Sequence, residues 1–426
     1  MRLLPWLAGL LLHTVAGAQT WQEGPGYRFA PLRVPPGGRA GFTLLLPQET
    51  GIWFTNSLPE SRSLTNTILP NGSGVAAGDV DGDGWCDLFF CGLQGGSRLY
   101  RNLGNWKFED ITERAGVLCS NLDATGAVFA DVNGDGSLDL IVNSIGGGTH
   151  VFLNDGKGHF TRSPQVLNAG RGGTSLALAD ADGSGRLDLY IANYRAATIM
   201  DAPGTRFNMR VVDNRVEVAG INGRPLTDPE WTNRFRFKTQ TDEHGRGKLA
   251  HEELGEPDLF CKNDGQGHFE AVSWTGGAFL DEEGKPLSAP PLDWGLSVAF
   301  RDFNGDGCPD LYVCNDFRSP DRFWLNDGHG WFRAAPLLAL RETSFSSMGI
   351  DVADLNRDGY DDFMVVDMLS RDHRRRLTQR NSMYAETSMM DSPDERIQYP
   401  RNTLFLNRGD GTYAEIAQYA GLEASE

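Results

Sequence analysis

Five nine-residue stretches of this chain share one spacing of oxygen-bearing side chains. Each begins with Asp, carries an Asp, Asn or Ser oxygen at positions 3 and 5, and has Gly at position 6 and Asp at position 9. Ca²⁺ in proteins takes about six to eight oxygen ligands, and such a loop offers side-chain oxygens at positions 1, 3, 5 and 9 and a backbone carbonyl at position 7. The sequence therefore predicts up to five Ca²⁺ ions.

The predicted ligands lie in five loops, which we number in chain order. They are Asp79, Asp81, Asp83, Trp85 and Asp87 in loop 1; Asp131, Asn133, Asp135, Ser137 and Asp139 in loop 2; Asp180, Asp182, Ser184, Arg186 and Asp188 in loop 3; Asp302, Asn304, Asp306, Cys308 and Asp310 in loop 4; and Asp354, Asn356, Asp358, Tyr360 and Asp362 in loop 5. Loop 1 has the most anionic set and is predicted to bind most tightly, and Ser184 is predicted to weaken loop 3.

The residues around each loop exclude the EF-hand, a helix-loop-helix calcium motif. An EF-hand needs a bidentate Glu at position 12, where the five loops have Phe90, Val142, Ile191, Val313 and Val365. Short apolar runs such as residues 127–130 and 140–142 instead flank the loops, and their length and β-branched content are typical of buried strands. Each loop is therefore predicted to be a strand-to-strand turn.

A second motif of Asn and Gly residues follows each loop and predicts a hairpin, because these residues tolerate positive φ. The five copies run from Asn102 to Phe108, Asn154 to Phe160, Asn263 to Phe269, Asn326 to Phe332 and Asn407 to Tyr413. Each unit then holds four strands, A to D, and the units recur about every 50 residues, which is the pattern of an all-β propeller with five complete four-stranded blades. A β-helix with calcium nonapeptides has a much shorter period.

Unequal spacing locates insertions between strands B and C of two units, at about residues 195–256 and 370–399. A further stretch, about 276–292, lengthens the connection after the third unit. In a four-stranded meander the A–B and C–D turns share one face and the other connections share the opposite face. The insertions are thus expected opposite the calcium loops, where variable loops on a rigid scaffold would bind a partner.

The N-terminus has the parts of a secretory signal peptide, namely Arg2, an apolar stretch over residues 3–12 and a small-residue site before Gln19. We expect residues 1–18 to be this peptide, 19–40 a linker and 41–426 the propeller, with no membrane span. Residues 42–46 have the spacing of a D strand that needs a partner blade. We therefore expect the sequence to be C-terminally incomplete.

The net charge of −18 is largely a property of the calcium loops and does not favour nucleic acid, which binds basic faces. Six Cys in an exported chain allow local Cys86–Cys91 or Cys308–Cys314 disulfides or buried free thiols. The basic residues of the fifth-unit insertion either bind an anionic partner or pair with nearby acids in a solvated loop; they are Arg371, Arg374, Arg375, Arg376 and Arg380.

These units resemble the FG-GAP/VCBS repeats of integrin α-type propellers, on stretches such as residues 74–84 and 153–160. Residues 193–195 and 347–351 are similar to the cartilage acidic protein and ASPIC/UnbV class. The resemblance covers about residues 41–426 and implies a seven-bladed propeller in the full-length protein, calcium binding and extracellular interaction. A C-terminal ASPIC/UnbV domain and EGF-like module, usual in that class, are not found in this sequence.

Two functions follow from these observations. The first is a non-enzymatic, secreted calcium-binding propeller that mediates interaction or adhesion with an extracellular protein or glycan; in a bacterium the location would be the periplasm or cell surface. The alternative is a polysaccharide-active enzyme such as a lyase with active residues on the inserted loops. No local catalytic motif such as HExxH or GxSxG is present, but a site assembled across blades would leave none.

Overall fold

The computed structural model describes residues 22–24, 27–29, 41–212, 215–241, 247–317, 319–379 and 396–425. The chain divides into two units, Met1–Leu46 and Pro47–Glu426. In the first unit β1 (Gln22–Gly24) pairs antiparallel with β2 (Tyr27–Phe29). The predicted signal peptide lies outside the described residues. The prediction of a D strand at residues 42–46 is wrong, because these residues form no strand and Phe42 and Leu44 are exposed.

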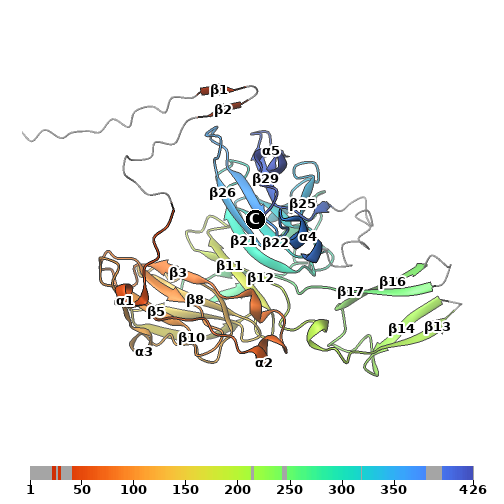
Figure 1. Cartoon of the computed structure of the whole chain (residues 1–426), viewed down its shortest axis with the longest axis horizontal. Coiled ribbons are helices and arrows are strands. Elements are labelled where there is room, and N and C mark those ends of the chain that lie inside the picture. The colour runs from red at the N-terminus through yellow and green to blue at the C-terminus, as the bar shows by residue number, and fades with distance from the viewer. Residues whose placement is uncertain are drawn as a thin grey trace, which may run out of the picture. The chain divides into compact units, whose positions relative to one another are not determined.

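The second unit is built around five sheets, each with four antiparallel strands in chain order, which we call blades 1 to 5; the sheet of blade 4 has a fifth strand at its edge (Figure 1). Their A to D strands are β3 (Val75–Gly78), β4 (Asp87–Phe90), β5 (Arg98–Asn102) and β6 (Phe108–Asp110); β7 (Ala124–Ala130), β8 (Asp139–Ser144), β9 (Thr149–Asn154) and β10 (Phe160–Leu167); β11 (Gly173–Ala179), β12 (Asp188–Asn193), β18 (Leu259–Asn263) and β19 (Phe269–Ala271); β21 (Gly295–Arg301), β22 (Asp310–Asn315), β23 (Arg322–Asn326) and β24 (Phe332–Ala334); and β26 (Gly349–Ala353), β27 (Asp362–Val366), β29 (Thr403–Asn407) and β30 (Tyr413–Glu415).

Strand pairing within the blades follows chain order and confirms the predicted all-β propeller fold. In every blade the loop predicted to bind calcium joins strands A and B, and the hairpin Asn pairs across strands C and D with the aromatic residue six positions later. Neighbouring A strands pack side by side along the series β3, β7, β11, β21 and β26. The repeat thus places all five loops at equivalent corners of successive sheets.

The hydrophobic core lies between the blades rather than within one sheet. Strand B of blade 2 is buried on both faces, and successive side chains of a strand point to opposite sides. Leu140 and Val142 accordingly pack with Phe89 of blade 1, while Ile141 packs with Leu189 of blade 3. Clusters of the same kind join blades 3 and 4 and blades 4 and 5. Each fully buried side chain of this size contributes roughly 1.5–3 kcal/mol.

Segments between strands B and C of blades 3 and 5 carry additional elements. The first holds β13 (Phe207–Val212), β14 (Arg215–Ile221), β15 (Arg224–Pro225), β16 (Phe235–Thr241) and β17 (Gly247–Glu253), and the two hairpins lie beside the blades in Figure 1. Short strands also pair parallel: β20 (Phe279–Leu280) with β24, and β25 (Glu342–Ser344) with β28 (Ile397–Tyr399). The helices are short: α1 (Pro47–Thr50), α2 (Glu60–Ser63), α3 (Thr112–Ala115), α4 (His373–Gln379), α5 (Ala417–Ala420), η1 (Leu69–Asn71) and η2 (Ile199–Asp201).

The structure shows the state of the cysteines, which the sequence left open, and a segment that packs against several blades. All six cysteines are free thiols, so neither local disulfide forms; Cys91, Cys261 and Cys314 are buried, the last two within strands. Residues 59–71, which we call the strap, include α2 and η1. The strap shares a hydrophobic cluster with the B–C connections of blades 1, 2 and 3 through Leu69, Leu93 and Tyr194. The face opposite the calcium loops is therefore partly covered by the chain itself.

Candidate metal centres

Backbone hydrogen bonds hold the first carboxylate of each loop in a fixed orientation. In loop 1, Asp79 Oδ1 accepts from the N–H of Asp83 at 3.1 Å, and Asp79 Oδ2 accepts from the N–H of Gly84 at 2.8 Å. Asp131, Asp180, Asp302 and Asp354 accept the same pair of bonds in the other loops. The fourth residue of every loop has positive φ. Gly82 of loop 1 adopts this conformation without strain, whereas Arg357 of loop 5 adopts it at a steric cost.

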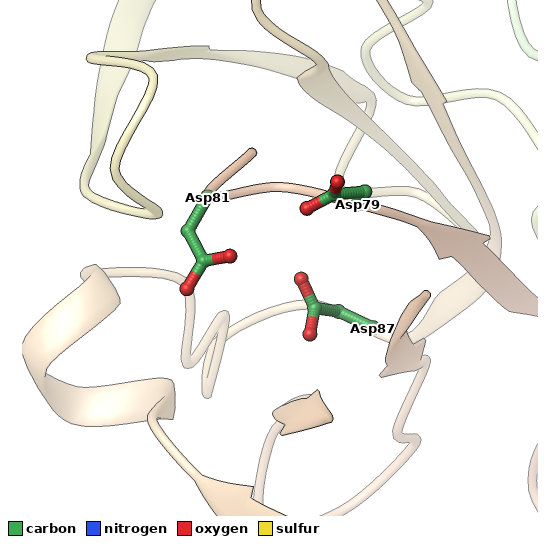
Figure 2. Close-up of side chains that lie close together, drawn as sticks. All are labelled: Asp79, Asp81 and Asp87. Atoms are coloured by element: carbon green, nitrogen blue, oxygen red, sulfur yellow. The ribbon is translucent and has the colours of Figure 1, made fainter. Parts of the chain in front are cut away.

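Loop 1 brings three carboxylates together from both ends of the loop (Figure 2). One oxygen each of Asp79, Asp81 and Asp87 lies within 4.8 Å of the others, and the described residues contain no other such group of His, Cys, Asp or Glu. Calcium ligands lie about 2.3–2.6 Å from the ion, so oxygens on opposite sides of it are about 5 Å apart. The donor set of loop 1 therefore fits Ca²⁺ in both chemistry and spacing.

The Asp at position 9 is buried in every loop and connects the loop to its own hairpin. Asp87 Oδ2 accepts from the N–H of Val80, and Asp87 Oδ1 accepts from the N–H of Asn102 at 2.7 Å. Burial raises the pKa of Asp87, and it raises the pKa of Asp310 in loop 4 to about 7. In each case the backbone N–H groups that bond the carboxylate lower the pKa and only partly offset the effect of burial. A bound cation would relieve this cost of holding a buried carboxylate charged.

Loop 3 leaves one of its buried oxygens without a hydrogen bond. Asp188 is about 1% exposed, and its Oδ2 has no hydrogen-bond partner among the described residues. Burial raises the pKa of Asp188 to about 6. Buried carboxylate oxygens in folded proteins are paired or coordinate a metal. The free oxygen is thus a second observation that fits a cation at these loops.

Loops 2, 4 and 5 carry Asn at position 3, and this amide contacts the carboxylate at position 5. Asn133 Nδ2 donates to Asp135 Oδ2 at 2.9 Å, and Asn304 and Asn356 make the same bond. Position 7 is predicted to act through its carbonyl oxygen, while its side chain packs over the hairpin glycine. A Cβ at Gly328 would lie 2.7 Å from Cys308 Sγ, so a larger residue there would have to displace the side chain of Cys308.

The hairpin asparagines connect each loop to the loop of the preceding blade, which the sequence analysis did not foresee. Asn154 Nδ2 of blade 2 donates to Val80 O in loop 1 at 2.8 Å and to Leu138 O in its own loop at 2.9 Å. Asn263, Asn326 and Asn407 make the corresponding pair of bonds. The repeated Asn was visible in the sequence, but its partner on another blade was not.

A second repeated constellation was missed at the other end of strand B in blades 3 and 4. Tyr190 OH donates to Asp258 Oδ2 at 2.8 Å, and Tyr312 OH donates to Asp321 Oδ2 at 2.7 Å. Burial raises the pKa of Asp258 and of Asp321 to about 7. The signal was the recurrence of Leu-Tyr-x-x-Asn followed by Pro-Asp, which the length of the third-unit insertion separates.

The insertion of blade 3 borders a pocket of about 260 Å³. It lies between Arg236 and Glu252 of the β16–β17 hairpin, Trp294 of the preceding connection and Arg322 of blade 4. Arg322 pairs with Asp293 at 2.7 Å.

In the basic run of blade 5, Arg371 Nη2 donates to Gly421 O and Arg376 Nε donates to Ser370 O, while Arg380 lies outside the described residues.

Among the described residues, the helices are too short and too polar to cross a bilayer. The FG-GAP-like repeat family matches residues 79–142, 131–191 and 302–365, which contain all five loops. These matches begin and end within the calcium-loop units. The repeat assignment and the strand geometry therefore coincide.

Cartilage acidic protein 1 from Homo sapiens is 25% identical over 338 residues, which is 70% of this chain and 50% of that protein. The protein of the same name from Mus musculus is 26% identical over 339 residues, 72% of this chain and 50% of that protein. The chain spans about half the length of these curated relatives.

Two solved structures also align. One is of an Agrocybe aegerita lectin described as recognising non-reducing terminal N-acetylglucosamine, with a TM-score of 0.31, 16% identity and coverage of 79% of this chain and 77% of that chain. The other is the V. cholerae biofilm matrix protein Bap1, with a TM-score of 0.31, 14% identity and coverage of 68% and 59%. Similarity at this level does not extend to ligands. The chain therefore carries FG-GAP-like repeats on a propeller fold, and it is similar to cartilage acidic protein 1.

Proposed function

We propose that this chain is a secreted, non-enzymatic scaffold in which Ca²⁺ stabilises the propeller and the opposite face binds an extracellular protein or glycan. The observation that carries the proposal is the clustering of Asp79, Asp81 and Asp87 oxygens within 4.8 Å in a loop whose design recurs in all five blades. Carboxylate oxygens at this spacing suit Ca²⁺. Metals that prefer thiolate or imidazole ligands are disfavoured, because this group of three contains neither.

Calcium in this proposal is structural. In loop 1 the side chains of Asp79, Asp81 and Asp87 and the carbonyl of Trp85 would hold the ion, and the ion would supply charge neutralisation for buried carboxylates. Asn154 links the same loop to the hairpin of blade 2 through Val80 O. Order in one loop is therefore transmitted to the neighbouring blade, which makes the scaffold depend on calcium.

The partner is proposed to bind at the insertion of blade 3, because this is the largest departure from the repeat. Its strands pack around a small core of Val218, Ile221 and Trp231. Met209 and Val211 of β13 are exposed on its surface. A rigid scaffold that carries one irregular, partly apolar module is a common arrangement for recognition.

Calcium titration tests the metal half of the proposal. Chelator-treated protein is titrated with Ca²⁺ by calorimetry, and the Asp79→Ala/Asp81→Ala variant is expected to lose one ion from the wild-type stoichiometry. Glu270→Ala removes an exposed carboxylate of β19 outside the loops and serves as the control, with no expected change. Unchanged stoichiometry in the double variant would refute the assignment of loop 1.

A module deletion tests the binding half. The two ends of the insertion lie together, since the N–H of Ile199 donates to Glu253 Oε2 at 2.8 Å, so residues 200–252 are replaceable by a short Gly linker. Wild-type and deleted proteins are compared on an array of neutral and acidic glycans and on extracellular matrix proteins, with Ca²⁺ and with chelator. Calcium-dependent retention that the deletion abolishes supports the proposal. Appearance of unsaturated products or new reducing ends would favour the lyase alternative instead.

A further inference from the structure

The residue directly before the hairpin Asn differs among the blades in a way that matches the calcium loops. It is Arg101 in blade 1 and Lys262 in blade 3, whereas blades 2, 4 and 5 have Leu153, Leu325 and Leu406. Blades 1 and 3 are also the two whose loops carry Asp rather than Asn at position 3. A basic residue on strand C therefore accompanies an additional carboxylate in the loop.

Both basic side chains contact that additional carboxylate. Arg101 Nε lies 2.5 Å from Asp81 Oδ2, and Arg101 Nη2 lies 2.8 Å from Asp83 Oδ2. In blade 3, Lys262 Nζ lies 2.9 Å from Asp182 Oδ2. Since Asp81 belongs to the group of three carboxylates that fits Ca²⁺, Arg101 lies at the edge of the proposed ion position.

The two loop types satisfy the same acceptor by different means. Asp83 Oδ2 at position 5 of loop 1 accepts from Arg101. In loop 2 the same acceptor, Asp135 Oδ2, accepts from the position-3 amide of Asn133. The four carboxylates of loop 1 and the single charge of Arg101 leave three negative charges, which is also the charge of loops 2, 4 and 5.

We propose that Arg101 and Lys262 are built-in counter-ions that set the divalent-cation affinity of loops 1 and 3. Arg101 keeps the affinity of loop 1 in the range of the Asn-type loops, which are loops 2, 4 and 5 with Asn at position 3. This inference rests on the proposed calcium function. The side chain of Arg101 neutralises Asp81 and Asp83 when the ion is absent and opposes the ion electrostatically when it binds. The ranking from sequence, in which loop 1 binds most tightly, then no longer follows from its carboxylate count.

An ordinary stabilising ion pair would behave differently. Loss of such a pair lowers stability equally with and without calcium. Under the proposal, Arg101→Leu lowers the melting temperature of the calcium-free protein, because four carboxylates are left without a counter-ion, and tightens calcium binding at loop 1. The two readouts move in opposite directions only if Arg101 opposes the ion.

Calorimetric titration of full-length chelator-treated protein at low ionic strength tests this, with the loop 1 step identified as the one that Asp79→Ala removes. Arg101→Leu is expected to tighten that step about tenfold, the effect of removing one charge about 6 Å from a divalent ion in water. Arg101→Lys keeps the charge and is expected to stay near wild type. Arg114→Leu removes an exposed charge of the same blade that pairs with Glu109 and is the matched control.

The double variant Asp81→Asn/Arg101→Leu rebuilds an Asn-type loop in blade 1. Its affinity is expected to return to within about threefold of wild type, because the loop again carries three negative charges. Unchanged or weaker binding in Arg101→Leu, with normal wild-type stoichiometry, would overturn the inference alone. Absence of calcium binding by the wild-type protein would overturn the proposed function and the inference together. Melting curves in saturating Ca²⁺ show that each variant is folded.

Discussion

The two faces of the propeller differ in how far their structure repeats from blade to blade. On the calcium-loop face, the same hydrogen bonds recur from blade to blade, and Asn154 and Asn263 each connect their own loop to the preceding one. On the opposite face each connection is different: the strap packs against the B–C connections of blades 1 to 3, and an insertion lengthens the B–C connection of blade 3. The repeated face holds the blades in register, which frees the other face to vary.

The largest expected effect is on the repeated face, by removal of calcium. Chelation is expected to lower the melting temperature by at least about 10 °C, because each ion present at about 100 times its dissociation constant stabilises the folded state by roughly 2.7 kcal/mol. Scanning calorimetry with and without chelator measures the change. Mg²⁺ at the same concentration is the control and should restore little, since these loops do not offer small octahedral sites. A chelated protein that melts as the loaded one does would remove calcium from the comparison.

The next effect belongs to the opposite face and depends on pH. Burial raises the folded-state pKa of Asp258 and Asp321 to about 7, so each carboxyl stabilises the fold in full below about pH 4 and loses this contribution as pH rises through 7. Between pH 5 and 7 the stability lost amounts to roughly 2 kcal/mol for each group. Urea unfolding in saturating Ca²⁺ is expected to show stability falling over this range.

The charged and titratable neighbours are Tyr190, Asp293 and Arg322 around Asp258, and Tyr312, Cys314, Asp367 and Arg396 around Asp321. Asp258→Asn removes the titration and is expected to flatten half of the pH slope. The variant should be least destabilised at pH 8, where the wild-type carboxylate is charged. An equal loss of stability at pH 5 and pH 8 would show that packing rather than charge explains the position.

A smaller effect on stability is expected from the hairpin Asn, and it should differ between blade 2 and blade 1. Asn154→Ala leaves Val80 O and Leu138 O without their donor, and is expected to cost about 2–3 kcal/mol. The Nδ2 group of Asn102 donates only to Cys86 O of its own blade, so Asn102→Ala is expected to cost about half as much. Urea midpoints of the two variants in calcium give the comparison. Equal costs would mean that the bond between blades contributes nothing measurable.

The smallest effect concerns the strap. Arg62 donates to both oxygens of Asp123 at 2.7 Å and to Leu93 O, at a partly exposed site. Arg62→Ala is expected to cost about 1 kcal/mol and to leave calcium stoichiometry unchanged. Arg62→Lys keeps the charge but lacks the two separate nitrogens that bond Asp123 and Leu93 O, and should recover only part of the loss. A change in calcium binding on either substitution would show that the two faces are coupled.

The sequence by itself determined the repeat: five loops, five hairpins and the strands between them, because the period-two burial of strands and the turn chemistry of Asp, Asn and Gly are local properties. It also gave the ligand types of the proposed metal sites. It misplaced a strand at residues 42–46, since a strand exists only with a pairing partner that local spacing does not guarantee.

Only the tertiary structure decided which groups meet across blades. It joined Asn154 to Val80, Tyr190 to Asp258, and Arg101 to the carboxylates of loop 1, and it covered the opposite face with the strap. Such contacts depend on how successive sheets twist and pack, so residues far apart in the chain become partners without any local pattern to announce them. The repeat fixes where the loops lie, and packing fixes the charges that surround them.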